Sequence, residues 1–403
     1  MISVKKIWFF LLVSLCFAHT LPAQEKLLSK SDMVKLDFDI LAAKQRRLKA
    51  GDATLQPAYR QLLTNADHLL SYAPVSVMDK ADTPPSSSKH DYMSIAPYFW
   101  PDSSKPNGLP YINKDGQVNP EVRKYTDKNN LPVLTDNVYT LALAYYFSGD
   151  EKYAEHASRL LEVWFLDTAT RMNPNLNYGQ AVKGVTEGRA AGLIDSRFFI
   201  WDIDAIGLLA HSRYWTPHDQ AGMQSWFAQF LHWLQTNNIG LEECKARNNH
   251  GVWYDAQCLS MALFLDSTQL AERIVRRTAD RLDKQMDDQG FFPLEMERTT
   301  SLHYTVFVLN AFFIVADLST KTRLNLWTWQ TPDGRSLKKA FDTTLPYIGK
   351  DKPWTGPQIT AFNFDNAIPL LLRGETHFGC DTCGKYIFKL TTPEYSKLLI
   401  NLL

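Results

Sequence analysis

Helical periodicity is the feature that most limits what this chain can fold into. From residue 134 onward, apolar residues recur at spacings of three and four in one segment after another, which is typical of helices that bury one side. These segments span 134–148, 151–165, 199–213, 217–237, 252–265, 268–285, 301–318 and 336–348. Segments 31–49 and 54–72 show the same pattern, and strand signals are scarce. The sequence therefore predicts an all-α fold.

Two all-α architectures fit a series of helical hairpins joined by loops. In an (α/α) toroid, paired inner and outer helices surround a central cleft, whereas tetratricopeptide-like repeats stack into a solenoid. The solenoid requires a repeat of about 34 residues, and no such period recurs here. We therefore predict an incomplete toroid formed by one domain, residues 24–403, because single large domains of this length are common.

The first 23 residues have the pattern of an export signal. Lys5 and Lys6 precede an apolar run over 7–18, and Leu21-Pro22-Ala23 then stands before polar residues, with a cleavage site expected after Ala23. A lipid anchor on Cys16 is the alternative, but Leu15 is bulky where a lipoprotein signal needs a small residue. No later segment offers roughly 20 uninterrupted apolar residues. We expect a secreted protein, most plausibly periplasmic, with no membrane span.

Charge and cysteine content narrow the function classes. The net charge is zero, so no global field attracts nucleic acid, and affinity for an acidic ligand requires a local basic cleft. The chain has 11 Trp and 17 Tyr, residues that pack in cores and also stack on sugar rings. Cys380 and Cys383 could form a disulfide, remain free or, with His377, provide part of a zinc site. We expect no metal and no cofactor, and the sequence does not predict the oligomeric state.

Two segments carry residues suited to proton transfer. Asn248, Asn249 and His250 stand where a polar loop meets an apolar helix, and one Asn there is explained by helix capping. About fifty residues later, Arg298 precedes Tyr304 in the first turns of the next apolar helix. A nearby cation lowers the pKa of a phenol, although Arg298 could instead pair with Glu295 or Glu297 as scaffold.

These residue types are sufficient for elimination from a uronic acid polymer. That reaction neutralises a sugar carboxylate, removes the proton beside it and protonates the leaving oxygen. Amide, guanidinium, imidazole and phenol groups can fill these roles. Residues 90–119, which are rich in Pro, Gly, Asn, Asp and aromatics without any period, are expected to form an ordered loop that lines the cleft.

Five stretches resemble the alginate lyase superfamily of secreted bacterial polysaccharide lyases. The run at 91–102, Asp-Tyr-Met-Ser-Ile-Ala-Pro-Tyr-Phe-Trp-Pro-Asp, is the most specific, and short motifs at 110–112 and 116–121 follow it. The Asn-Asn-His at 248–250 and the Ser-Leu-His-Tyr at 301–304 are similar to the family's catalytic segments. The resemblance covers roughly residues 91–348. It implies an (α/α) toroid that cleaves uronate polymers internally by β-elimination, without a redox cofactor.

By position, the resemblance implies a role for each catalytic residue. Asn249 would neutralise the substrate carboxylate, His250 would accept or relay a proton, and Tyr304 would protonate the glycosidic oxygen. In syn elimination Tyr304 would be both base and acid, whereas in anti elimination His250 would be the base. Arg298 departs from the familiar mannuronate lyases, whose arginine stands where this chain has Glu297. That departure implies a branch acting on glucuronan as well as mannuronate-rich alginate.

Further polar and aromatic residues are candidates for binding substrate in the cleft. They are Asn248, Tyr178, Gln180, Arg189, Glu243, Trp100 and Trp253. Glu243 would orient the His250 imidazole, and the two tryptophans would stack on sugar rings unless they belong to the core.

Two other functions remain open at this point. A glycoside hydrolase on the same toroid would need a pair of carboxylic acids across the bond, for which Glu243, Glu295, Glu297 and Asp255 are the candidates. A surface glycan-binding protein would need no chemistry at all, so Asn249, His250 and Tyr304 would be dispensable for everything except binding.

Overall fold

The computed structural model describes residues 33–391 and 399–403. The predicted signal peptide, residues 1–23, therefore lies outside the described residues. The helices are α1 (Phe38–Lys49), α2 (Gln56–Leu69), α3 (Thr126–Ser148), α4 (Glu151–Leu161), α5 (Phe199–Leu209), α6 (Pro217–Thr236), α7 (Asn238–Cys244), α8 (Asn249–Phe264), α9 (Thr268–Gln285), α10 (Pro293–Met296), α11 (Ser301–Ser319), α12 (Leu337–Ile348), α13 (Ile368–Phe378) and α14 (Cys383–Thr391). The predicted all-α class is confirmed.

Helices α3, α5, α8 and α11 form the inner layer of an open ring. Consecutive members of this series contact one another, and α4, α9 and α12 pack on α3, α8 and α11 respectively. The inner helices are apolar on all sides because both faces are covered, whereas α4 and α9 have one buried and one exposed face. This is the arrangement of an (α/α) toroid, as predicted.

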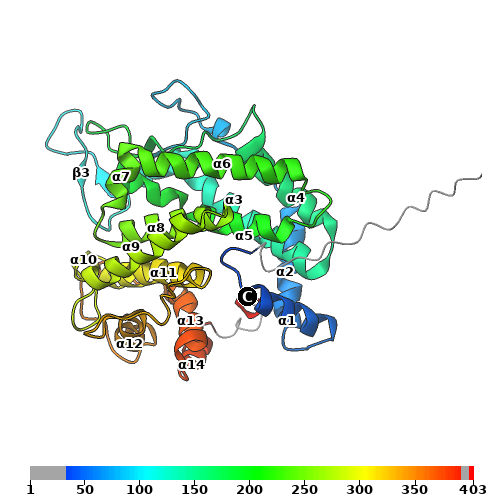
Figure 1. Ribbon diagram of the computed structural model, residues 1–403. Helices are drawn as coiled ribbons and strands as arrows, with labels where there is room; N and C mark the ends of the chain where they lie inside the picture. The colour runs from blue at the N-terminus through cyan, green and yellow to red at the C-terminus, as the bar shows by residue number, and fades with distance from the viewer. Residues whose placement is uncertain (1–32, 392–398) are drawn as a thin grey trace, which may run out of the picture.

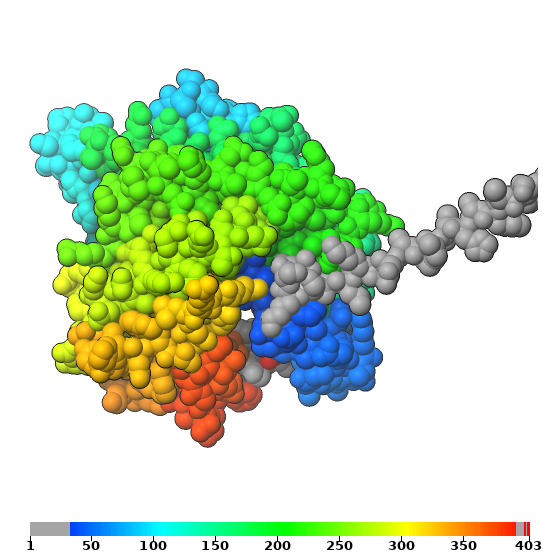
Figure 2. Space-filling model, in the orientation of Figure 1, coloured from blue at the N-terminus to red at the C-terminus, as the bar shows by residue number. Residues whose placement is uncertain are grey.

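The ring is not closed by the inner helices. Figure 1 shows α13 and α14 on one side of its lower edge and α1 and α2 on the other, with the C-terminus beside α1. The buried apolar residues of all these parts, from Met33 to Leu402, nevertheless belong to one continuous core. The space-filling view shows the first and last helices facing each other, and the loop that carries β3 projecting at the upper left (Figure 2).

Helix α11 is the one described helix whose length and composition would suit a membrane span. Its mean hydropathy reaches 1.5, but 78% of its most apolar window is buried within the protein. Neighbouring helices therefore already cover its apolar surface.

Several helix boundaries differ from the predicted ones for local reasons. Helix α1 begins at Phe38 because the Asp37 side chain accepts hydrogen bonds from the amides of Asp39 and Ile40. Helix α3 begins well before residue 134 and contains Pro132 within it. Segment 151–165 ends as an α-helix at Leu161 and continues as a π-turn, Glu162–Leu166. Helices α7, α10, α13 and α14 were not predicted.

The long segment 90–119 is ordered by short strands, as its predicted cleft-lining role requires. Strand β1 (Met93–Ile95) pairs in parallel with β4 (Tyr178–Ala181), and β2 (Phe99–Trp100) pairs antiparallel with β3 (Ile112–Asn113). The 3₁₀ segment η5 (Ala190–Phe198) follows β4 and leads directly into α5. These strand pairings hold the loops around β1–β4 beside the inner helices. The candidate site lies between these loops and the inner helices.

Candidate active site

A cleft of about 570 Å³ collects most of the residues that the sequence singled out. Helix α8 contributes Asn249 and His250, and α11 contributes Tyr304. The rest of the polar lining of the cleft consists of Tyr98, Asn113, Asp115, Lys128, Gln180, Arg189, Asp195, Arg197, Arg298, His303, Asn310 and Asn366. Segments about 270 residues apart in the chain, from Pro97 to Asn366, therefore meet around one space.

The two asparagines at the start of α8 have different roles. Asn248 is the N-cap, because its side chain accepts a hydrogen bond from the amide of His250 at 3.2 Å, and it does not line the cleft. Asn249 is fully buried and donates its side-chain Nδ2 to both carboxylate oxygens of Glu295, at 3.0 and 2.8 Å. Burial raises the pKa of Glu295 despite these donors. The Asn249 NH₂ group is thus occupied, and its Oδ1 is buried without a partner among the described residues.

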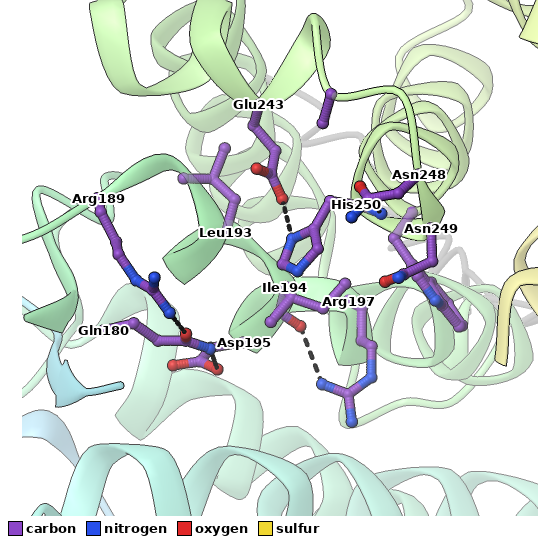
Figure 3. A network of polar contacts seen from close by, with 12 residues as sticks. Gln180, Arg189, Leu193, Ile194, Asp195, Arg197, Glu243, Asn248, Asn249 and His250 are labelled. Atoms are coloured by element: carbon purple, nitrogen blue, oxygen red, sulfur yellow. Dashed lines mark hydrogen bonds and ion pairs between the residues drawn. The ribbon is translucent and has the colours of Figure 1, made fainter. Parts of the chain in front are cut away.

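His250 is oriented by a carboxylate, as proposed from the sequence. Its Nδ1 lies 2.6 Å from Oε1 of the buried Glu243, seven residues earlier on α7 (Figure 3). A carboxylate at Nδ1 favours the proton on that nitrogen and leaves Nε2 with its lone pair. Because the ring lines the cleft and is partly exposed, Nε2 is the atom available to a ligand.

The phenol of Tyr304 is paired with a second phenol that the sequence did not single out. Its hydroxyl donates to the hydroxyl of Tyr98 at 2.8 Å, across 206 residues of chain. Burial and Tyr98 raise the pKa of Tyr304 well above its ordinary value, and Arg298 opposes this increase without cancelling it. The expected lowering of this pKa by Arg298 is therefore outweighed, and Tyr304 holds its proton at neutral pH.

Arg298 pairs with a residue that was not predicted. Its Nε donates to Oδ1 of Asp115 at 3.0 Å, and its Nη2 contacts the same carboxylate, so the expected pairing with Glu295 or Glu297 is wrong. The guanidinium carbon lies 3.6 Å from the ring centroid of Tyr304, which places the cation on the ring face. Asp115 also accepts hydrogen bonds from the amide and hydroxyl of Thr299. The loop after β3 is thereby fixed beside the phenol.

A second polar network forms another wall of the cleft. The buried Asp195 accepts from Tyr92, Ser94, Gln180 and Lys128, whose Nζ lies 2.6 Å away. Burial raises the pKa of Asp195, but Lys128 and the other donors outweigh it and lower the pKa overall. Gln180 in turn accepts from Nη2 of Arg189 at 3.0 Å. The predicted contacts Gln180 and Arg189 therefore line the cleft as one chain of hydrogen bonds (Figure 3).

Arg197 and His303 are among the cleft residues that were not selected from the sequence. Arg197 lies between the rings of Phe198 and Phe307, 4.1 and 5.7 Å from their centroids. His303 stacks on Phe307, and burial, with help from Arg298 and Arg197, lowers its pKa. His303 stands directly before Tyr304, in the segment that resembles a catalytic one, whereas no sequence pattern described above marks Arg197.

Several proposed substrate contacts lie outside the cleft. Trp253 is 3% exposed and packs against Phe307 in the core, so its predicted stacking on a sugar ring is wrong. Trp100 donates to the Gln117 carbonyl beneath Lys114, and neither it nor Tyr178 lines the cleft. Asn248, as the helix cap, is likewise not a lining residue. The side chain of Trp253 is buried because α8 is an inner helix covered on all sides.

The carboxylates considered for a hydrolase are not arranged as a pair across the cleft. Asp255 is buried against Arg277, Thr278 and Arg281. Glu243 and Glu295 are bound to His250 and Asn249, and Glu297 is exposed. Cys380 and Cys383 form a disulfide at the start of α14. Within 33–391 and 399–403, no group of three or more His, Cys, Asp or Glu residues is placed to hold a metal ion.

We expect the bond between Asp115 and Arg298 to stabilise the protein in a pH-dependent way. Although burial opposes ionisation, Arg298 and Thr299 lower the pKa of Asp115 from 3.8 to about 2. A depressed folded-state pKa stabilises the protein above the unfolded value, and this contribution is lost as pH falls from about 4 toward 2. D115N should lower the free energy of unfolding by about 1–2 kcal/mol near neutral pH, after allowance for partial exposure.

Denaturant titrations at several pH values test this expectation. The deficit of D115N relative to wild type should be constant from pH 7 to about 5 and shrink below about 4. The matched control is D342N, which breaks the exposed pair of Lys338 and Asp342 and should have little effect. Equal deficits in the two variants, or one independent of pH, would contradict a special role for Asp115.

A helical toroid whose cleft combines imidazole, phenol, guanidinium and amide groups has the fold and the chemical groups expected of a polysaccharide lyase. The family model for alginate lyase matches residues 76–354. The chain therefore belongs to the alginate lyase family and is a polysaccharide lyase, as the sequence resemblance implied.

Solved structures agree with this assignment. An alginate lyase from Bacteroides ovatus is 39% identical, with a TM-score of 0.87 over 92% of this chain and 98% of that chain. Alginate lyase A1-III from Sphingomonas species A1 is 16% identical, with a TM-score of 0.56 over 91% of this chain and 93% of that chain, and shows the shared fold. A search of curated proteins gave no significant match.

Proposed function

We propose that this lyase cleaves β-1,4-linked uronate polymers, either alginate rich in mannuronate or glucuronan, and leaves a 4,5-unsaturated uronate at the new end. The similarity to an alginate lyase of 39% identity supports a polyuronate substrate. The charges of the cleft support it as well, because Lys128, Arg189, Arg197 and Arg298 outnumber Asp115 and Asp195 among its lining residues. A local excess of cations provides the affinity for an acidic polymer that a neutral chain otherwise lacks.

We assign the proton transfers to His250 and Tyr304. The observation that carries this assignment is the contact of Nδ1 of His250 with Glu243, because it leaves Nε2 free to accept the proton on C5 of the sugar. Tyr304 holds its proton in the empty cleft, which suits an acid that protonates the departing glycosidic oxygen. This division favours His250 over Tyr304 as the base.

Asn249 then acts in another way than the resemblance implied, and Arg298 supports the phenol. Because Asn249 directs its NH₂ group to Glu295, its free Oδ1 would accept a hydrogen bond from the substrate instead of neutralising a carboxylate. Arg298, paired with Asp115 and lying on the Tyr304 ring, would hold the phenol in place and limit the rise of its pKa. Gln180 and Arg189 would contact the neighbouring sugars of the polymer.

Export to the periplasm is part of the proposal. The signal-like pattern of residues 1–23 supports it, and so does the disulfide between Cys380 and Cys383, since such bonds persist in oxidising compartments. The substrate would thus meet the enzyme outside the cytoplasm.

A panel of polymers tests the proposed reaction. Alginate, polymannuronate, polyguluronate and glucuronan are mixed with the protein, and the ultraviolet absorbance of the unsaturated product is followed. We expect product from polymannuronate, glucuronan or both. New reducing ends without that absorbance would instead indicate a hydrolase, and polymer binding without any cleavage would indicate a glycan-binding protein.

A further inference from the structure

Asn249, the residue first expected to neutralise the substrate carboxylate, and two other polar groups of the cleft are already occupied inside the protein. The NH₂ of Asn249 is bound to Glu295, and the guanidinium of Arg298 is paired with Asp115. Nδ1 of His250 is held by Glu243. Elimination nevertheless requires a cation or strong donors at the carboxylate, because negative charge builds up on its oxygens when the neighbouring proton leaves.

Two of the four fixed cations in the cleft have no such partner. Lys128 is paired with Asp195, and Arg298 with Asp115. In the described part of the chain, no carboxylate lies within ion-pairing distance of Arg189 or Arg197. A guanidinium left unpaired in a largely buried position is costly unless a ligand supplies the countercharge.

Arg197 is the better placed of these two arginines. Its Nη1 donates to the carbonyl of Ile194 at 2.9 Å, which leaves the remaining N–H groups of the fork available. The rings of Phe198 and Phe307 flank the guanidinium and restrict its position. The adjacent Asp195 attracts Arg197 electrostatically but forms no ion pair with it, and four other side chains already donate to that carboxylate.

The surroundings of Arg197 place it at the reacting sugar. Figure 3 shows its side chain in the same space as Asn249 and His250, and all three line the cleft. Phe307, on which the guanidinium packs, also stacks against His303, the residue before Tyr304. Arg189 instead donates to Gln180 and lies over the ring of Phe99, a residue of the loop wall.

We propose that Arg197 binds the carboxylate of the sugar that loses its C5 proton, and so serves as the charge-neutralising residue of the reaction. This inference rests on the proposed function. In the step, the C5 proton moves to Nε2 of His250, a double bond forms between C4 and C5, and the C4–O4 bond breaks. The electron pair leaves with O4, which takes the Tyr304 proton, while Arg197 stabilises the charge that develops on the carboxylate.

Esterification of the substrate separates this role from a structural one. A methyl ester keeps the C5 proton and the leaving group but carries no negative charge, so it needs no neutralising cation. We expect R197M to lower kcat/KM on the free-acid polymer by about 10²-fold or more and to change kcat/KM on its methyl ester far less. R197K keeps the positive charge but loses the paired N–H donors of the guanidinium. Its kcat/KM on the free acid should lie between those of wild type and R197M.

Three controls make the outcome decisive. R213M removes an exposed guanidinium that packs on Tyr214 outside the cleft, and should match wild type on both substrates. R189M should lower kcat/KM on the free-acid polymer and on its methyl ester by similar factors. Calorimetric binding of a free-acid oligosaccharide to Y304F and to Y304F/R197M measures the carboxylate contact without turnover, and the double variant should bind more weakly.

The proposal is overturned by any of three results. Equal losses on acid and ester in both R197M and R197K would mean that Arg197 only supports the fold. Unchanged rates and binding would mean that it does not touch the carboxylate, and a selective loss in R189M would move the role to Arg189. If wild type forms no unsaturated product from either substrate, the proposed function itself fails, which is a separate result.

Discussion

Replacing Tyr304 by Phe should lower turnover of the preferred uronate polymer by about 10²–10⁴-fold, the usual contribution of a positioned general acid. The substitution removes one hydroxyl group and leaves the ring that packs beneath Arg298 and beside His303. Without the phenol, no proton is available at the leaving oxygen, whereas the rest of the cleft is unchanged. Affinity for the polymer should therefore remain close to that of wild type. Initial rates from product absorbance, with calorimetric binding, measure both effects.

Y139F is the matched control for this substitution. Tyr139 is also a buried tyrosine of an inner helix, but it does not line the cleft, and its hydroxyl has no partner among the described residues. Its loss should leave turnover intact. If Y304F retained wild-type turnover, Tyr304 would not be the acid, and the Tyr98 hydroxyl that accepts its hydrogen bond would become the next candidate.

The fold was largely predictable because helical periodicity is a local property. Segment 268–285 was predicted with the boundaries of α9, an amphipathic outer helix. The start of α3 was not predicted because a proline inside a helical pattern usually marks a helix boundary. The helix nevertheless continues through Pro132. Helix α8 likewise begins at Asn249, so two catalytic candidates stand in its first turn instead of in a loop before it.

The candidate site was predictable only where neighbours in sequence are neighbours in space. Glu243 and His250 are seven residues apart and meet as expected. Asp115 meets Arg298 across 183 residues, and Tyr98 meets Tyr304 across 206, so no local pattern could connect them. The hydrogen-bond partner of the Asn249 side-chain amide could not be predicted either, because it is Glu295, a carboxylate on a separate short helix. Long-range partners therefore decide what each predicted residue can do.

Replacing His250 by Ala should also lower turnover by about 10²–10⁴-fold, because it removes the proposed base. The space left by the ring opens onto the cleft, so imidazole added to the solution should enter it and restore part of the rate. The measurement is turnover of H250A against imidazole concentration. H68A, which changes an exposed histidine of α2, should behave as wild type. Full activity of H250A without imidazole would leave Tyr304 as both base and acid.

Glu243 should matter only through the imidazole that it positions. In E243Q the negative charge that stabilises a protonated ring is lost, and turnover should fall about tenfold or more, by analogy with carboxylates that orient a catalytic histidine. Because Glu243 touches no substrate, E243Q should add little to the loss already caused by H250A, so the two changes will not be additive. A double-mutant cycle on kcat measures this coupling. Independent, additive losses would show that Glu243 acts through the fold or the substrate, and not through the proposed base, His250.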